Sequence, residues 1–313
     1  MNGKVLVCDP LEPEGVNELR KAGLEVDERP TISGQELLGI VPNYDALVVR
    51  SRTKVTRDVI QSAQRLKAIV RAGVGLDNVD VESAKQRGIQ VLTTPAASTS
   101  SVAELTVTLM LNALRQVSLA DRSMKEGKWI KSKLIGQELK GKTVGVIGIG
   151  GRIGGEVARI LSAGFRASVL GYDIVDVRQR AADLKVTIIE DLDDLLARSD
   201  IVTVHVTYSP STHHLLNEKR IAAMKKGSVL INTSRGDIVD GHALLKALKE
   251  KHLSGAGLDV FHNEPPQEEW EKELVTLPDG VTVCTCHIGA QTTEAQNTAS
   301  IMAAEVLIKA LSF

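Results

Sequence analysis

Short runs of apolar, mostly β-branched residues alternate with longer amphipathic segments from Lys4 onward. The runs at 5–7, 46–49 and 68–70 predict strands, and the segments at 13–22, 56–64 and 80–86 predict helices. Strands that are apolar on both faces and separated by helices are typical of a parallel sheet covered by helices on both sides. This part of the chain therefore predicts an α/β domain.

The same alternation begins again after a long apolar stretch. Its predicted strands cover residues 143–147, 168–170, 201–204, 229–231 and 256–258. The stretch from Val102 to Ala120 is interrupted by polar residues, which excludes a membrane span and predicts one long, buried helix. A last helix is predicted over 292–313, and the polar stretch at 121–140 is a linker or an exposed arm. The fold class is therefore α/β, with two doubly wound parallel-sheet domains.

Length and composition narrow the class of protein further. The 313 residues suffice for two domains, and 38 Lys and Arg against 39 Asp and Glu leave a net charge of −1. This balance, with only three Phe, three Tyr and two Trp, disfavours a nucleic-acid or membrane-surface binder and favours a small polar partner. Three cysteines and an amino terminus without the pattern of a signal peptide predict a cytoplasmic protein.

A glycine-rich loop, residues 148–154, follows the predicted strand at 143–147 and precedes a helical segment. In this context glycines allow a tight turn and let a pyrophosphate approach the backbone at the N-terminus of a helix. The strict motif spacing places its third glycine at position 153, but Ile153 stands there and Gly154 follows. We expect a dinucleotide-binding loop in which an inserted residue widens the turn, with Gly151 accommodating it.

Asp173 ends the next predicted strand, close to the separation of about 20 residues at which a carboxylate binds the adenosine ribose hydroxyls. A negative charge there favours NAD, because it repels the additional phosphate of NADP. The alternative is that Asp173 only caps a turn. Arg178, five residues further on, leaves some use of NADP open.

Three residues with acid–base or anion-binding chemistry lie near the carboxyl ends of later predicted strands: Arg235, Glu264 and His287. Ligands of open α/β sheets bind beyond these strand ends, so the placement favours a catalytic site. Each residue also has a structural alternative, respectively a surface arginine, a turn carboxylate and a buried histidine with satisfied hydrogen bonds. The chain has seven histidines, so this residue type alone discriminates little.

A metal site at Cys284, Cys286 and His287 is not expected. In a strand the two cysteines share one face while His287 points to the other, and no second cluster of ligands matches them.

Taken together, these motifs resemble the NAD-dependent D-2-hydroxyacid dehydrogenase family over essentially the whole chain. The resemblance rests on the glycine loop, on Asp173, and on the segments 235–240, 258–265 and 287–290. Three further segments, 48–56, 71–80 and 127–129, are most similar to the members that oxidise D-3-phosphoglycerate.

The resemblance implies hydride transfer between NAD and a small anionic 2-hydroxy acid. His287 would exchange the hydroxyl proton, Glu264 would pair with its other ring nitrogen, and Arg235 would bind the substrate carboxylate. The most specific expectation is oxidation of D-3-phosphoglycerate to 3-phosphohydroxypyruvate, the first step of serine biosynthesis. Two alternatives stay open: a glyoxylate or hydroxypyruvate reductase without a phosphate site, and an NAD-sensing interaction protein like the corepressor branch of the family.

The resemblance also implies a set of contact residues. Those expected at the cofactor are Val74, Gly148, Gly150, Arg152, Ile153, Asp173, Val206, Thr233, Ser234, Arg235, Asp259, His287, Gly289 and Ala290. Those expected at the substrate are Arg50, Lys54, Val74, Gly75, Arg235 and His287. Arg50 and Lys54 would bind the substrate phosphate, although both equally fit solvated surface charges.

A split architecture follows from the same resemblance. Residues 1–98 and 288–313 would form a flavodoxin-like substrate domain, and residues 99–287 a Rossmann NAD-binding domain, with the active site in the cleft between them. The long helix and the 121–140 arm would join a homodimer. The length leaves no room for the regulatory domain that many relatives carry after this point, so feedback through such a domain is expected to be absent.

Overall fold

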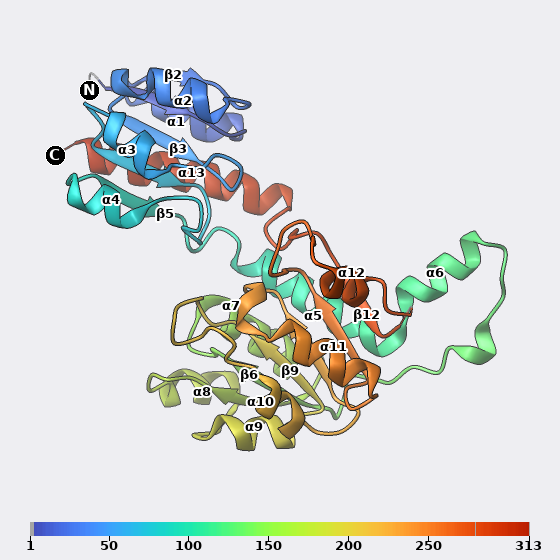
Figure 1. The fold of residues 1–313 in the computed structure, drawn as a ribbon. Coiled ribbons are helices and arrows are strands. Elements are labelled where there is room, and N and C mark those ends of the chain that lie inside the picture. The colour runs from blue at the N-terminus through green and yellow to red at the C-terminus, as the bar shows by residue number, and fades with distance from the viewer. Residues whose placement is uncertain (1–2, 279, 313) are drawn as a thin grey trace. The chain divides into compact units, whose positions relative to one another are not determined.

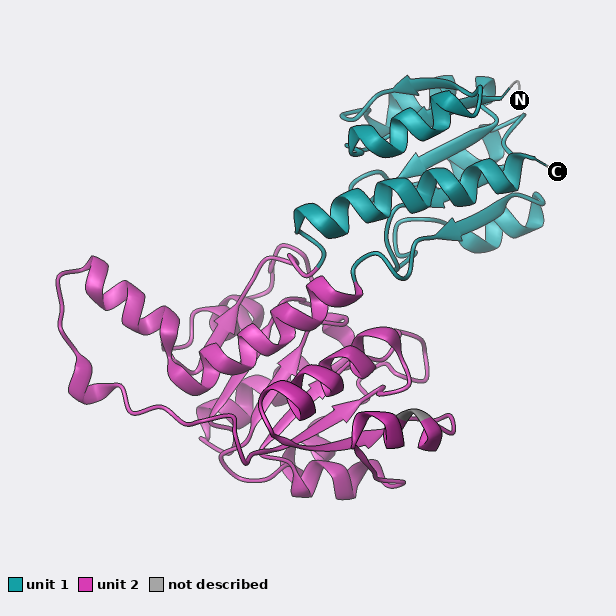
Figure 2. Cartoon of the chain, turned by 180° about the vertical axis from the view of Figure 1, so that it is seen from behind, with its two compact units in different colours: residues 1–98, 290–313 teal, residues 99–289 magenta. Residues whose placement is uncertain are grey.

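The structure, a computed structural model, describes residues 3–278 and 280–312. The chain forms two compact units, unit 1 with residues 1–98 and 290–313 and unit 2 with residues 99–289 (Figure 2). The division of substrate and cofactor between two domains stays a prediction for these units.

Unit 1 contains a five-stranded sheet in which every pair of strands is parallel (Figure 1). The strands are β1 (Lys4–Val7), β2 (Glu25–Glu28), β3 (Ala46–Val49), β4 (Ala68–Arg71) and β5 (Gln90–Thr93). The helices are α1 (Pro13–Lys21), α2 (Gly34–Ile40), α3 (Arg57–Ser62), α4 (Val81–Gln86) and α13 (Thr293–Leu311), with a 3-10 turn at Val41–Asn43. The order β2-β1-β3-β4-β5 is the flavodoxin order, and it reverses between β1 and β3.

The helices of unit 1 cover both faces of this sheet. The helices α2, α3 and α4 contribute to one apolar core, and α1 and α13 contribute to the other. The last helix, α13, packs closely on α1, because a Cβ at Gly15 would overlap the backbone of Ser300. The backbone N–H of Glu12 also donates to Ser300 Oγ at 2.9 Å. The chain therefore returns at its carboxyl end to complete unit 1.

Unit 2 contains a seven-stranded parallel sheet. The strands are β6 (Thr143–Ile147), β7 (Ser168–Tyr172), β8 (Thr187–Ile188), β9 (Ile201–Val204), β10 (Val229–Asn232), β11 (Gly255–Leu258) and β12 (Thr282–Cys284). The helices are α5 (Thr99–Arg115), α6 (Val117–Lys125), α7 (Arg152–Arg159), α8 (Arg178–Leu184), α9 (Leu192–Arg198), α10 (Glu218–Ala223), α11 (Gly241–Lys249) and α12 (Glu269–Val275). A π-helical turn at Ile160–Gly164 follows α7, and 3-10 turns lie at Lys131–Lys133 and Gly236–Ile238.

The strand order of unit 2 is β12-β11-β10-β9-β6-β7-β8, the Rossmann order extended by one strand. Helices α9 to α12 pack on one face, and α5 and α7 pack on the other. The order reverses between β6 and β9, so the carboxyl ends of these strands form the point at which such sheets bind ligands. The predicted fold class, two doubly wound parallel sheets, is confirmed.

The prediction of one continuous helix over 102–120 is wrong. The chain leaves the helical conformation at Gln116, whose φ of 53° and ψ of 41° are left-handed, and α6 starts at the next residue. The side chain of Asn112 stabilises this break, since its Oδ1 accepts the N–H of Ser118 at 2.9 Å. Among the described residues, no helix is long and apolar enough to cross a membrane.

Candidate active site

His287 and Glu264 form a hydrogen-bonded pair in unit 2. His287 lies shortly after β12 and Glu264 shortly after β11, and His287 Nδ1 is 2.6 Å from Glu264 Oε2. Their side chains are 45% and 38% exposed, so a solute can reach them. The second carboxylate oxygen, Glu264 Oε1, accepts the N–H of Phe261 at 3.2 Å, which fixes the orientation of the carboxylate.

The environment keeps Glu264 ionised. Burial alone would raise the pKa of its carboxyl, but the hydrogen bond and charge of His287, the N–H of Phe261 and the charge of Arg235 together hold that pKa below its ordinary value. An ionised carboxylate can only accept, so the proton between the pair resides on His287 Nδ1. His287 Nε2 is then the ring nitrogen that can exchange a proton with a bound molecule.

Asp259 holds the backbone turn that carries His287. Its carboxylate is 1% exposed and accepts Thr285 Oγ1 at 2.6 Å, Ile288 N at 2.8 Å and Gly289 N at 2.9 Å. His287 has a left-handed φ of 53°, a conformation unfavourable for a residue with a Cβ. The bonds to Asp259 on both sides of His287 stabilise this conformation. The cofactor contact expected of Asp259 stays a prediction.

Glu271, which the sequence did not single out, fixes the loop that carries Glu264. This carboxylate is 1% exposed and accepts Asn263 N at 2.7 Å, Asn263 Nδ2 at 3.0 Å, and the N–H groups of Gln267 and Glu268 at 3.0 Å each. Burial would raise the pKa of Glu271, but these donors lower it to about 2. Glu271 therefore ties down the loop on both sides of Glu264.

Arg235 follows β10 and begins the 3-10 turn beside the Glu264 loop. The side chain of Asn232 shapes this segment, because its Nδ2 donates to Arg235 O at 2.8 Å and its Oδ1 accepts Ser234 N at 3.0 Å. A Cβ at Gly236 would overlap the backbone of Phe261, so only glycine lets the loops after β10 and β11 come this close. The structure thus brings together the three predicted catalytic residues.

The glycine loop takes up its extra residue before α7 begins. Gly148 has a φ of 86°, Gly151 is the N-cap of α7, and a Cβ at Gly154 would overlap the carbonyl group of Gly148. Gly148 therefore makes the tight turn and Gly154 the close strand–helix contact, the two roles expected of the first and third glycines. The first N–H groups of α7, from Arg152 and Ile153, have no partner within a helix, so the loop fits a pyrophosphate.

Asp173 lies beside this loop, at the end of β7. Its Oδ2 accepts Gly150 N at 2.8 Å, and its Oδ1 accepts Val175 N at 3.3 Å. A Cβ at Gly150 would lie 2.8 Å from Asp173 Oδ2, so a glycine at the second motif position is what permits this approach. The ribose contact expected of Asp173 stays a prediction.

Other predicted cofactor residues lie at the same carboxyl edge of the sheet. Ser234 Oγ donates to Val206 O at 2.7 Å, which joins the ends of β9 and β10. Thr233 Oγ1 shares a hydrogen bond of 2.9 Å with Thr106 Oγ1 on α5. Ala290, in contrast, belongs to unit 1, where its carbonyl oxygen accepts Gln296 Nε2 at 2.6 Å.

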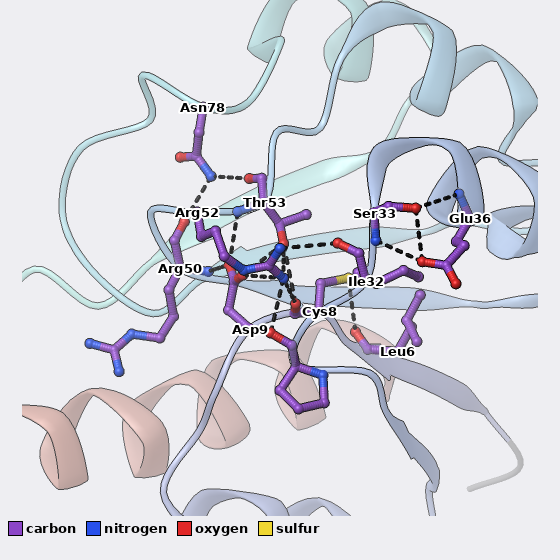
Figure 3. Close-up of polar contacts among 11 residues, drawn as sticks. Leu6, Cys8, Asp9, Ile32, Ser33, Glu36, Arg50, Arg52, Thr53 and Asn78 are labelled. Carbon is purple, nitrogen blue, oxygen red and sulfur yellow. Dashed lines mark hydrogen bonds and ion pairs between the residues drawn. The ribbon is translucent and has the colours of Figure 1, made fainter. Parts of the chain in front are cut away.

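The remaining predicted substrate residues belong to unit 1. Arg50 follows β3 and is half-buried, whereas Lys54 is exposed four residues later. Figure 3 shows the guanidinium of Arg50 directed away from the hydrogen-bonded group formed by its neighbours. After β4, the backbone N–H groups of Val74 and Gly75 donate to no other described residue, and the Val74 side chain is 45% exposed. These donors are available to an anion.

The described residues contain no group of three or more His, Cys, Asp or Glu that could hold a metal ion. Cys8, Cys284 and Cys286 are free thiols.

The fold and this site define an α/β protein whose dinucleotide-binding unit also carries a histidine–carboxylate pair. Residues 107–289 match the family model "D-isomer specific 2-hydroxyacid dehydrogenase, NAD binding domain". The chain therefore belongs to the D-isomer specific 2-hydroxyacid dehydrogenases, and the family and the cofactor NAD expected from the sequence are confirmed.

Relatives span the chain almost completely. It is 45% identical over 305 residues to D-3-phosphoglycerate dehydrogenase of Archaeoglobus fulgidus, covering 97% of this chain and 56% of that protein. It is 45% identical over 311 residues to hydroxypyruvate reductase of Thermotoga maritima, covering 98% of both. Among solved structures, D-lactate dehydrogenase from Aquifex aeolicus, complexed with NAD and lactic acid, matches with a TM-score of 0.83 at 30% identity, over 99% of this chain and 95% of that one. The chain thus spans little more than half of the Archaeoglobus fulgidus protein, and it covers 57% of D-3-phosphoglycerate dehydrogenase of Methanocaldococcus jannaschii.

Proposed function

We propose that this protein oxidises a small D-2-hydroxy acid to the 2-oxo acid, and catalyses the reverse reduction, with NAD as the cofactor. The observation that carries the proposal is the 2.6 Å contact between His287 Nδ1 and Glu264, which leaves His287 Nε2 available, while the charge of Arg235 acts on Glu264. The family membership sets the reaction class within which this pair is interpreted.

The residues divide the reaction between them. When held at the glycine loop 148–154, NAD would supply the acceptor for the hydride that leaves the C–H carbon of the substrate in oxidation. His287 Nε2 takes the hydroxyl proton as the C=O bond forms. Glu264 stabilises the resulting imidazolium, and the planar guanidinium of Arg235 binds the substrate carboxylate through two parallel hydrogen bonds. In reduction each transfer runs backwards.

As the specific substrate we propose D-3-phosphoglycerate, which the reaction converts to 3-phosphohydroxypyruvate, the first step of serine biosynthesis. Arg50 and Lys54 supply two cations near the end of β3 for the phosphate group. Several relatives at 42–45% identity carry the name of this activity, which supports the proposal.

Hydroxypyruvate is the second candidate substrate, because the relative that matches this chain over 98% of both lengths is named hydroxypyruvate reductase. The two candidates differ by one phosphate group. An NADH absorbance assay that compares kcat/KM for 3-phosphohydroxypyruvate and hydroxypyruvate decides between them. A preference for the phosphorylated acid supports the first candidate, and a preference for hydroxypyruvate supports the second.

We also propose that the protein is a homodimer joined through α5, α6 and the 121–140 arm. The arm exposes two large apolar side chains, Trp129 at 77% and Ile135 at 85%. Apolar side chains this exposed are typical of a surface that another chain covers.

A further inference from the structure

Unit 1 has a strand-order reversal of its own, between β1 and β3. Open parallel sheets bind ligands beyond the carboxyl ends of the two strands that flank such a reversal. Asp9 follows β1 and Arg50 follows β3, so these two residues stand at that position in unit 1. Their contacts show how the position is built.

Asp9 organises the segment that starts with Arg50. Its carboxylate is 1% exposed, and its Oδ2 accepts Arg50 N at 2.6 Å and Thr53 N at 3.2 Å. Its Oδ1 accepts Thr53 Oγ1 at 2.7 Å and forms an ion pair with Arg52 at 3.0 Å. One buried carboxylate thus fixes both ends of the short loop from 50 to 53 (Figure 3).

Asn78 holds the same loop from its other side. Its Nδ2 donates to Arg50 O at 2.7 Å and to Thr53 O at 2.6 Å. Its own carbonyl oxygen accepts Val55 N at 2.8 Å. The backbone of Arg50 and of Thr53 is therefore bound through its N–H by Asp9 and through its carbonyl oxygen by Asn78, which leaves the loop little freedom.

The two arginines of this loop have different surroundings. The guanidinium of Arg52 is engaged, since it donates to the carbonyl oxygens of Cys8 at 2.6 Å and of Pro30 and Ile32 at 3.0 Å each. The guanidinium of Arg50 forms no hydrogen bond or ion pair with any described residue, although it is half-buried. Its burial lowers the pKa of Arg50, and the charges of Asp9 and Glu12 only partly oppose this. A partly desolvated cation without a partner is suited to bind an anion.

We propose that Asp9 and Asn78 are positioning residues, which hold Arg50 ready for the anionic group that distinguishes a phosphorylated 2-hydroxy acid from its unphosphorylated analogue. This inference rests on the proposed function, because it assumes that Arg50 contacts the substrate phosphate. A loop that is already ordered favours binding. The conformational entropy of the Arg50 backbone is lost when the protein folds, so substrate binding does not have to order it.

The test compares Asp9→Asn with the matched control Asp45→Asn. Asp45 is also buried, at 5% exposure, accepts Lys4 N at 2.9 Å and pairs with Arg65 at 3.0 Å. Asp45 lies at the amino ends of β1 and β3, whereas Asp9 lies at their carboxyl ends. Asp45→Asn therefore removes a similar buried carboxylate but leaves the contacts of the Arg50 loop in place. The measured quantity is the ratio of kcat/KM for 3-phosphohydroxypyruvate to that for hydroxypyruvate, with NADH.

In Asp9→Asn the new amide NH₂ faces backbone N–H donors, and we expect the ratio to fall by about tenfold or more. The kcat for hydroxypyruvate should stay close to that of the unsubstituted protein. Asp45→Asn should lower the Tm but leave the ratio unchanged. Thr53→Val, which replaces one hydroxyl by a methyl group, gives a milder test if Asp9→Asn does not fold, and should also lower the ratio. Asn78→Ala should do so as well.

Arg50→Gln separates the inference from the function on which it rests. If Arg50→Gln lowers the ratio but Asp9→Asn, Thr53→Val and Asn78→Ala do not, the positioning role is wrong while the phosphate contact stands. If Arg50→Gln leaves the ratio unchanged, both the phosphate contact and the positioning role are wrong. If Asp45→Asn lowers the ratio as much as Asp9→Asn does, the effect comes from general destabilisation of the fold, and the inference is also wrong.

Discussion

His287 Nδ1 lies 2.6 Å from Glu264 Oε2, and each of the two residues is carried by a segment that a separate buried carboxylate holds. Asp259 binds the turn of His287, and Glu271 binds the loop of Glu264. The acid–base pair thus depends on two further carboxylates that do not themselves belong to it. This arrangement allows the pair and its support to be tested separately.

Replacement of His287 should remove the proton exchange. We expect His287→Ala to lower kcat roughly 10²–10⁴ fold, because the group that exchanges the hydroxyl proton is lost. NADH should still bind, because the glycine loop lies between β6 and α7, far from His287 in the sequence. Steady-state kinetics and NADH fluorescence titration measure the two effects. The control is His242→Ala, an exposed histidine that contacts Trp270 and not the pair. Near-normal turnover in His287→Ala would remove this residue from the mechanism.

Replacement of Glu264 should change the pH dependence of ketone reduction. In this direction His287 must carry the proton, and the low pKa of Glu264 shows that its carboxylate is a stable anionic partner near neutral pH. In Glu264→Gln the imidazolium loses that anion, so the fall of reduction activity with rising pH should move to lower pH. A profile of kcat/KM against pH is the measurement, and an unchanged profile would contradict the pairing.

Glu271 should stabilise the fold above acid pH. Its pKa is lowered from 4.5 to about 2 in the folded protein, so its contribution, roughly 3 kcal/mol, is present above 4.5 and is lost as the pH falls towards 2. Glu271→Gln should reduce the free energy of unfolding at neutral pH, flatten its dependence on pH in that window, and lower kcat. Urea denaturation at several pH values tests this.

The control for Glu271 is Glu273→Gln, an exposed carboxylate on the same helix that pairs with Lys249. It should change the stability little. Equal effects of the two substitutions would mean that the contacts of Glu271 with the Glu264 loop do not matter.

Asp173 should select NAD over NADP. Asp173→Ala removes the negative charge at the end of β7, and we expect the ratio of kcat/KM for NADP to that for NAD to rise at least about tenfold. Asp176→Ala removes an exposed carboxylate three residues further on and serves as the control. If both variants remain as selective as the unsubstituted protein, the selectivity lies elsewhere.

The exposed arm should carry the dimer contact. Trp129→Ser, alone or with Ile135→Ser, should weaken association because both side chains are exposed in the single chain. Light scattering over a range of concentrations reports the mass. A dimer of undiminished stability in the double variant, or a monomer without substitution, would contradict the proposed interface.

The sequence predicts the buried strands well and the exposed edges poorly. The strand Ala46–Val49 is buried throughout, and its apolar run is evident in the letters. The edge strand β2, Glu25–Glu28, was not predicted, because three of its four residues are charged and only its pairing with β1 makes it a strand. The helix break at Gln116 was likewise not predicted, because no glycine or proline stands at that position.

The candidate site shows the same limit. Arg235, Glu264 and His287 stand in motifs, and so they could be predicted. Asp9 and Glu271 lie outside the motifs that we recognised, and their partners are mostly backbone N–H groups. Every residue except proline has a backbone N–H, so the sequence does not indicate which of these groups a carboxylate binds. The residues that hold a site in place can therefore be identified only from the fold.

Because α13 belongs to unit 1, unit 1 can be completed only after the whole of unit 2 has been translated. Residues 1–98 leave the ribosome first. One apolar face of unit 1 is covered only after α13 has been synthesised, because α13 supplies Ala299, Ala303 and Leu307, which pack with Val5, Val7, Leu19 and Val70. Nearly two hundred residues of unit 2, 99–289, are translated in between. Unit 2 can therefore fold during synthesis while unit 1 still lacks a helix, and in this interval the nascent chain offers chaperones an unfinished apolar surface.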